Sequence, residues 1–400
     1  MTRDAAPTPP SERIVSLDAL RGFALLGIFV INIWVFAMPE ATLINPTAYG
    51  DFTGANYWAW FVGHVFGQSK LITLFSALFG AGILLFVESK EEKGQPAVRL
   101  HYRRTAILIV IGLLHSYLLW YGDILVAYGL TGLFLVTLRD LEAKQLAGLA
   151  GIFLLFVPSM ELFAAVTLGG EAIASQWAPA EAAIRQEVAT YRGGWFEQLD
   201  HRVSSSFQRQ TTGFIGSSFW RIGGVMLLGM ALYRWGALTG ERSTRFYRGL
   251  IAVGVVGVGI VVAGVAYIEA NDWSADAALF WLQFNYVGSL LVAGGYLGIV
   301  TLYVRRRPDG PVTIALAAVG RTAFTNYLLQ TVIATTIFYG HGFGLFGSVS
   351  RVEQYGIVVV VWTVQIALSV LWLRSYRFGP VEWVWRTLTY GERQPMRKTE

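Results

Sequence analysis

Ten apolar segments, each long enough to cross a lipid bilayer, constrain this 400-residue chain more than any other feature. A helix rises about 1.5 Å per residue, so about 20 apolar residues span the hydrocarbon core. Only 14% of the residues are charged, against about 25% in soluble domains. The sequence therefore predicts an all-α, polytopic integral membrane protein of about ten transmembrane helices. The predicted segments are 20–38, 58–87, 104–121, 123–138, 145–168, 219–236, 249–268, 278–303, 313–338 and 355–373.

Two of these segments are irregular. The second is too long for one simple span and is interrupted by Gly67, Gln68, Ser69 and Lys70, so residues 58–66 either span the membrane or lie in its interface. The third and fourth segments are joined only by Tyr121 and Gly122, which predicts a tight helical hairpin.

The distribution of Lys and Arg predicts the orientation, because positive loops stay in the cytoplasm. Alternate loops are rich in Lys and Arg, whereas 39–57 and 269–277 contain neither and 339–354 contains only Arg351. We expect both termini in the cytoplasm, with a cytoplasmic segment 1–19, a transmembrane domain 20–373 and a cytoplasmic tail 374–400 that is amphipathic. The stretch 169–218 contains four arginines, but long translocated segments obey this rule poorly, so we expect it to be extracytoplasmic and partly helical.

Several classes of function are excluded. The absence of cysteine removes disulfides, thiolate metal sites and Cys nucleophiles, and no metal site is predicted. The net charge of +5 comes from basic clusters between apolar runs, which favours membrane orientation over nucleic-acid binding. The glycine-rich strings at 254–264 and 291–298 lie inside spans, so we interpret them as helix-packing surfaces.

Polar side chains within spans are costly in lipid and so indicate candidate sites. In the first helix, Asp18, Arg21 and Asn32 lie near one face, with Asn32 about 16 Å along the axis from Arg21. The alternative is structural, with an ion pair between Asp18 and Arg21 at the helix start and an interhelical hydrogen bond from Asn32.

His115 lies deep in the third segment, eleven residues after Arg104. A histidine there can transfer a proton near neutral pH, or it can be a packing residue with satisfied hydrogen bonds. Asp123 follows at the outer hairpin, where it would either orient His115 or cap the next helix. His64 is a weaker candidate because its segment is predicted to be partly interfacial.

The ninth segment carries the string GRTAFTNYLLQ at 320–330. Asn326 and Gln330 are four residues apart and share a helix face. If the helix begins near Arg321, this guanidinium lies at the level of the cytoplasmic headgroups and can bind phosphate, either of a substrate or of lipid.

Five motifs stand out along the chain: RIVSLDALRGFALLGIFVINI at 13–33, KLITLFSALFGAG at 70–82, the pair Arg103–Arg104 followed by GLLH and YGDIL, GRTAFTNYLLQ at 320–330, and GPVEWVWRTLTYG at 379–391. Together these motifs resemble the YeiB-like family of bacterial inner-membrane proteins. The LDALRG string with Asn32 is also similar to the start of heparan-alpha-glucosaminide N-acetyltransferase. The resemblance implies a multi-pass acyltransferase in the bacterial inner membrane.

Such enzymes transfer an acyl group from cytoplasmic acyl-coenzyme A to a hydroxyl or amine. The resemblance implies that Arg21, Arg103, Arg104 and Arg321 hold the coenzyme A phosphates and that His115, with Asp123, is the general base or the acyl carrier. Acyl-coenzyme A would be a co-substrate, with no permanently bound cofactor. The remaining polar residues, Asn32, Asn326, Gln330 and Asp18, would bind the thioester oxygen or the acceptor, which would be a glycan, a lipid or a metabolite.

Two other classes of function stay open from the sequence. The same polar residues would line the substrate path of a transporter, or would hold helices together in a structural membrane protein. Partners beyond the lipid bilayer and the substrates, including a second copy of the chain, are not fixed by the residues.

Overall fold

The computed structural model describes residues 14–398, all of whose regular elements are helices. Residues 1–13 of the predicted N-terminal segment 1–19 lie outside this range. The principal α-helices are α1 (Val15–Ala37), α2 (Gly54–Phe66), α3 (Lys70–Glu91), α4 (Ala97–Leu118), α5 (Leu125–Leu135), α6 (Ala143–Leu168), α7 (Ala174–Trp177), α8 (Glu181–Arg192), α9 (Leu199–Gln210), α10 (Phe219–Arg234), α11 (Thr244–Ala270), α12 (Ala275–Arg306), α13 (Pro311–Arg321), α14 (Ala323–Phe338), α15 (Arg351–Ser375) and α16 (Pro380–Tyr390).

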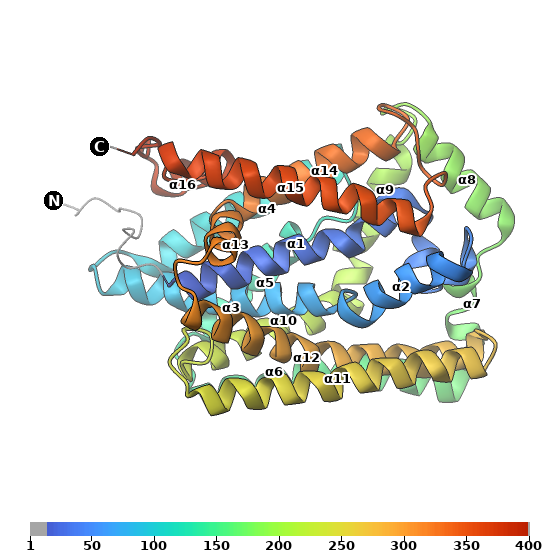
Figure 1. The fold of residues 1–400 in the computed structure, drawn as a ribbon, viewed down its shortest axis with the longest axis horizontal. Coiled ribbons are helices and arrows are strands. Elements are labelled where there is room, and N and C mark those ends of the chain that lie inside the picture. Colours follow the sequence, from blue (N-terminus) through green and yellow to red (C-terminus); the bar gives the residue numbers. More distant parts are fainter. Residues whose placement is uncertain (1–13, 399–400) are drawn as a thin grey trace.

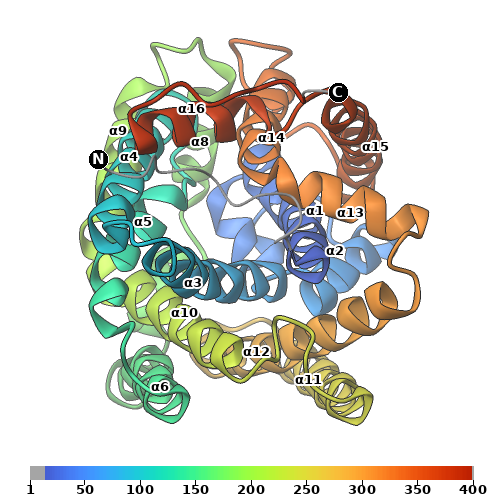
Figure 2. The same ribbon diagram turned by 90° about the vertical axis from the view of Figure 1, so that its left-hand side faces the viewer.

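The long helices run roughly parallel to one another in a bundle (Figure 1). Viewed end-on, α1 lies inside the bundle, and α6 and α11 lie at its edge (Figure 2). In their most apolar windows, 67% of the α1 residues are buried, against 17% for α6. The apolar surface of α6 therefore faces outward, as expected for a helix that contacts lipid.

Seven helices of the described chain are long and apolar enough to cross a membrane, or eight if the bent pair α13 and α14 is one span. The prediction of a helical multi-pass membrane protein is confirmed at this level. Two of the ten predicted segments correspond to α4 and α5, and neither is among these seven helices. The helix α4 carries His101, Arg103 and Arg104, and α5 is short.

The structure departs from the predicted boundaries in three places. The segment 313–338 is not one straight span, because α13 and α14 meet at Thr322 with a bend of 80°. The link between α4 and α5 extends from Leu119 to Ile124 and is longer than the predicted two-residue hairpin. Residues 199–218, predicted to be separate from the next span, continue into α10 through a π-helical turn at Phe214–Ser218.

Glycines bring several pairs of helices into backbone contact, among them α11 with α12 and α1 with α13. The predicted packing strings of α11 and α12 face each other, and a Cβ at Gly254 would lie 2.7 Å from the Cα of Gly295. Between α1 and α13, a Cβ at Gly22 would lie 2.0 Å from the carbonyl oxygen of Leu316, and one at Gly320 would lie 1.9 Å from that of Asp18. Small residues permit this approach, and it places α13 against the start of α1.

Candidate functional site

His115, near the end of α4, lies in a line of three hydrogen-bonded side chains. Its Nδ1 is 2.9 Å from Oδ1 of Asp123, and its Nε2 is 2.9 Å from Oγ1 of Thr331 on α14. In the neutral tautomer that carries its proton on Nδ1, the imidazole donates to the carboxylate and its Nε2 accepts from the Thr331 hydroxyl. A hydroxyl, an imidazole and a carboxylate in this order form the arrangement that activates oxygen nucleophiles.

The surroundings of His115 exclude water and fix the ring. The side chains of His115 and Asp123 are each 1% exposed. The Tyr327 ring lies 5.2 Å from the imidazole, centroid to centroid. The second carboxylate oxygen of Asp123 accepts from the backbone N–H of Val126 at 2.9 Å, at the start of α5. Asp123 therefore makes both contacts that the sequence left as alternatives.

The carbonyls that end α4 are held by the segment 169–218. Trp195, Arg202 and Ser206 donate to the carbonyl oxygens of Leu118, Tyr117 and Ser116, at 2.8, 2.9 and 3.1 Å respectively. The last carbonyls of a helix have no partner within it, so these side chains cap α4 directly beyond His115. The segment containing α8 and α9 thus fixes the end of the helix that carries the candidate base.

A charged cluster lies at this same end of the bundle, the end that contains α7 and α8. The helix α16 lies at the opposite end (Figure 1). Glu40 forms an ion pair with Arg209, whose guanidinium lies 4.8 Å from the ring centroid of Tyr121. The backbone N–H of Glu40 donates to Glu187 on α8 at 2.9 Å. Burial, and to a smaller extent the charge of Glu40, raise the pKa of Glu187 to about 7, although the hydrogen bond from the backbone of Glu40 lowers it.

The predicted phosphate-binding arginines lie at the other end of the bundle, with α16. Arg21 forms an ion pair with Asp18 at 2.9 Å, as the structural alternative described. The Arg104 guanidinium lies 4.4 Å from the Trp385 ring centroid of α16 and interacts electrostatically with Arg21. Arg321, the last residue of α13, donates to the carbonyl of Arg377 at 3.4 Å.

The C-terminal helix α16 packs over these arginines. Arg103 lies against Gly391, just after α16. The buried Glu382 of α16 accepts from the backbone N–H groups of Phe324 and Thr325, at 2.7 and 3.1 Å, and so caps α14 beyond the bend. Burial raises the pKa of Glu382 above its usual value. The amphipathic tail predicted from the sequence is therefore a docked helix.

The other predicted substrate-binding residues do not contact His115. Asn326 donates to Thr322 and to Ser369 of α15, each at 2.9 Å, and Gln330 donates to Gln365 of α15 at 3.0 Å. These bonds join α14 to α15, so both side chains point away from the imidazole. Asn32 is half-buried in the second half of α1.

Sequence reasoning missed two groups of polar residues. Thr331 directly follows Gln330, and only the packing of α14 against α4 shows that it faces His115. Lys70 is a buried cation and Arg221 a half-buried one, each on a helix long and apolar enough to cross a membrane. The sequence analysis treated Lys70 only as part of the interruption at 67–70 and did not single out Arg221 inside the segment 219–236, although a lysine and an arginine beside or within apolar segments are a usable signal.

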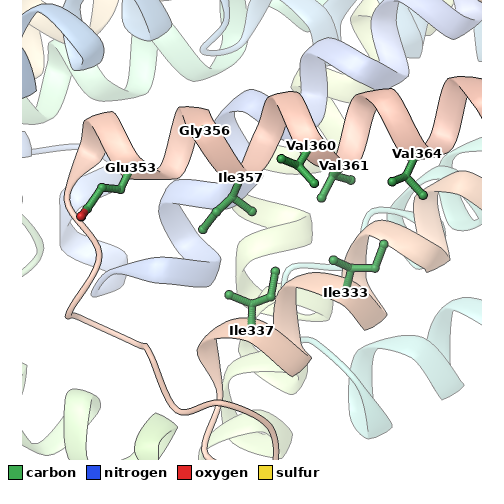
Figure 3. A pocket seen from close by; sticks show the side chains of 8 residues that line it. All are labelled: Ile333, Ile337, Glu353, Gly356, Ile357, Val360, Val361 and Val364. Carbon is green, nitrogen blue, oxygen red and sulfur yellow. The ribbon is translucent and has the colours of Figure 1, made fainter.

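A groove of about 480 Å³ lies between α14 and α15 (Figure 3). Six of its eight lining residues are Ile or Val, and Glu353 is the one ionisable residue among them. Such a lining suits hydrocarbon, and the Glu353 carboxylate accepts from the backbone N–H and the hydroxyl of Ser350 at the start of α15. In the part of the chain that the structure describes, no three His, Asp or Glu side chains lie together as metal ligands. The candidate site is therefore the line through His115.

Comparison with known proteins agrees with the motifs. The family described as "Protein of unknown function (DUF418)" matches residues 232–392. The chain is 36% identical over 383 residues to "Uncharacterized protein YeiB" of Escherichia coli, covering 94% of this chain and 96% of the relative. It is 32% identical over 415 residues to "Uncharacterized protein YxaH" of Bacillus subtilis, covering 98% of each. This chain therefore belongs to the YeiB-like DUF418 family.

Proposed function

We propose that this protein is a membrane acyltransferase that moves an acyl group from cytoplasmic acyl-coenzyme A to a hydroxyl or amine of an envelope glycan, lipid or metabolite. The observation that carries the proposal is the buried line Thr331–His115–Asp123. A neutral imidazole with a carboxylate on Nδ1 has Nε2 available to accept a proton from a hydroxyl.

Transfer would proceed by attack on the thioester carbonyl. Nε2 of His115 takes the proton of the acceptor as its oxygen or nitrogen bonds to the carbonyl carbon. The carbon–sulfur bond then breaks, and the imidazolium returns the proton to the departing thiolate. Asp123 stabilises the imidazolium between these steps. The Thr331 hydroxyl lies where an acceptor hydroxyl would have to lie, or itself carries the acyl group in a two-step route.

The arginines would bind the donor at the end of the bundle with α16. Arg21, Arg104 and Arg321 come from three helices, and guanidinium groups bind phosphate through paired hydrogen bonds. Arg104 precedes His115 by eleven residues on α4, which corresponds to about 16 Å along the helix. The flexible arm between the phosphates and the sulfur of coenzyme A would bridge this separation.

The first experiment is a calorimetric titration of the detergent-purified full chain with acetyl-, long-chain acyl- and free coenzyme A. We expect saturable binding that Arg321→Ala weakens at least about tenfold, the loss expected for about 1.4 kcal/mol. Arg245→Ala, which removes an exposed cation in the first turn of α11, is the matched control. Absence of binding by folded protein would end the proposal, as would full transfer activity in His115→Ala.

We further propose ten spans with both termini in the cytoplasm of a bacterial inner membrane. In this topology α2 and α3 form one span, α4 and α5 are two spans, and α13 with α14 is another. Two features support it. The start of α1 and α16 lie at one end of the bundle (Figure 1), and the exposed side chains in the second half of α4 are apolar: Val110, Leu113, Leu114 and Leu118. A fluorescent protein that matures only in the cytoplasm, fused after residue 400, should fluoresce, whereas a periplasmic phosphatase fused there should be inactive.

A transporter is the second candidate. The 80° break at Thr322 favours it, because transporters commonly build substrate sites from interrupted helices. Uptake of envelope precursors into proteoliposomes, without consumption of acyl-coenzyme A, would support transport over transfer.

A further inference from the structure

A lysine is buried near the middle of the bundle. Lys70, the first residue of α3, is 0% exposed. Its Nζ donates to the carbonyl oxygen of His64 at 2.5 Å and to Asn285 of α12. The adjacent Leu71 contacts Gly27, at the midpoint of α1, where a Cβ would lie 2.4 Å from Leu71 Cγ. This depth separates Lys70 from lipid headgroups at either end of α1.

A second cation lies about one helical turn away. Arg221 of α10 donates to Thr73 of α3 at 3.1 Å and to Ser289 of α12 at 2.6 Å, and its guanidinium lies 4.0 Å from the ring centroid of Tyr286. Lys70 and Arg221 interact electrostatically. Both cations therefore lie between α3 and α12, with α10 beside them.

The spacing of their partners fixes this geometry. Lys70 and Thr73 are three residues apart on α3, and Asn285 and Ser289 are four apart on α12, so each pair shares a helix face. Lys70 bonds to Asn285, and Arg221 bonds to Thr73 and Ser289. The two positive groups are thus held on successive turns, about 5 Å apart along the helices.

No described carboxylate lies within ion-pair distance of either cation. The acid that interacts with Arg221 at longer range is Glu161 of α6, which accepts from Gln283 at 2.7 Å. When both groups are protonated, one carboxylate opposite two cations leaves excess positive charge. In a low-dielectric interior this repulsion is costly unless a counter-charge is present.

We propose that Lys70 and Arg221 form an intramembrane binding site for a small anion, of the halide or short carboxylate class. An anion between the two groups would accept a proton of the ammonium group and an N–H of the guanidinium while cancelling the excess charge. Asn285, Thr73 and Ser289 hold the cations in place. The site lies on α3, α10 and α12, so it is separate from the proposed donor and acceptor residues, which lie on α1, α4, α13 and α14 and in the link between α4 and α5.

The test uses full-length protein purified in detergent with gluconate as the only anion. Chloride, acetate or phosphate then replaces gluconate at constant ionic strength while the unfolding midpoint is measured. We expect a saturable rise with chloride or acetate, and at least tenfold weaker apparent affinity in Lys70→Gln and Arg221→Gln. Arg245→Gln, which removes an exposed cation, should titrate like the wild type.

Equal responses in wild type and both variants, or no saturable response in the wild type, would overturn the proposal. If the charge-removing variants do not fold, Ser289→Ala removes only one contact to Arg221 and should still weaken the midpoint response. Crystals grown in bromide give an independent measurement. Anomalous scattering between Lys70 and Arg221 supports the site, and its absence there overturns it.

Discussion

The Asp123 carboxylate bonds His115 with one oxygen and the start of α5 with the other, each at 2.9 Å. Catalysis and helix capping therefore depend on the same side chain. The two roles separate in Asp123→Asn, because an amide oxygen accepts one hydrogen bond but carries no charge to stabilise an imidazolium. We expect acyl transfer to fall about 10³-fold, while the free energy of unfolding changes by about 1 kcal/mol.

Release of free thiol from acyl-coenzyme A, measured beside thermal unfolding, checks this separation. Asp140→Asn, whose side chain is 79% exposed, is the control and should change neither quantity. Full activity in Asp123→Asn would remove Asp123 from the mechanism.

Thr331 provides a second test of the line through His115. Thr331→Val keeps the shape but removes the hydroxyl, and Thr331→Ser restores it. If Thr331 carries the acyl group, the valine variant should lose at least about 100-fold in rate and the serine variant should retain most activity. Thr335→Val is the control, because the hydroxyl that it removes lies one turn later and bonds only to the backbone of Val332. This variant should leave the rate of acyl transfer nearly unchanged. Equal activity of the valine and serine variants would show that Thr331 does not carry the acyl group. Its hydroxyl would then mark the position that the acceptor hydroxyl takes.

The contact between α1 and α13 predicts a strong effect of one methyl group. Gly320→Ala places a Cβ 1.9 Å from the carbonyl oxygen of Asp18, so the two backbones must separate. We expect a loss of about 1–3 kcal/mol in stability. Gly151→Ala in α6 meets nothing within 4 Å and should be neutral or stabilising. Thermal unfolding in detergent compares the two, and an unchanged midpoint for Gly320→Ala would contradict the described packing.

The cap that Glu382 provides for α14 predicts a graded loss of stability across two substitutions of this residue. Glu382→Ala leaves the N–H groups of Phe324 and Thr325 without an acceptor and should cost about 1–3 kcal/mol, with faster proteolysis of α16. Glu382→Gln keeps one acceptor oxygen and should cost less. Limited proteolysis followed by mass spectrometry measures the release of the helix. The exposed Glu392→Gln is the control, and equal protection of all variants would show that α16 is held without this cap.

The acid on α8 predicts a pH dependence of stability. The pKa of Glu187 is about 7 in the folded protein, above the ordinary value of 4.5. The folded state therefore holds this proton more tightly, and the contribution to stability is lost as pH rises from about 4.5 to about 7. The loss is on the order of 3 kcal/mol at most.

Unfolding midpoints are measured between pH 4.5 and 8 for the wild type and for Glu187→Gln, whose side chain does not titrate. The difference between the two profiles gives the contribution of Glu187 to stability. Glu181→Gln, on the same helix and 81% exposed, should follow the wild type. A wild-type profile parallel to that of Glu187→Gln would rule out a raised pKa.

The sequence alone determined the class of fold and the chemistry available to it. Apolar runs of about 20 residues require helices in a membrane, because backbone polar groups in lipid must bond within their own segment. The interruption at Gly67–Lys70, the glycine packing strings and the amphipathic tail followed from the same local rules. His115 and Asp123 stood out because ionisable groups are rare within or beside such runs.

Only the tertiary structure decided which polar groups meet. Gln330 and Thr331 are adjacent, but successive helix residues point about 100° apart, so one faces α15 and the other faces His115. Periodicity defines faces but not the neighbour that each face contacts. The same limit hid Lys70 and Arg221, which lie far apart in the chain and meet through α12. The bend at Thr322 likewise depends on a cap from Glu382, sixty residues later, which no local pattern contains.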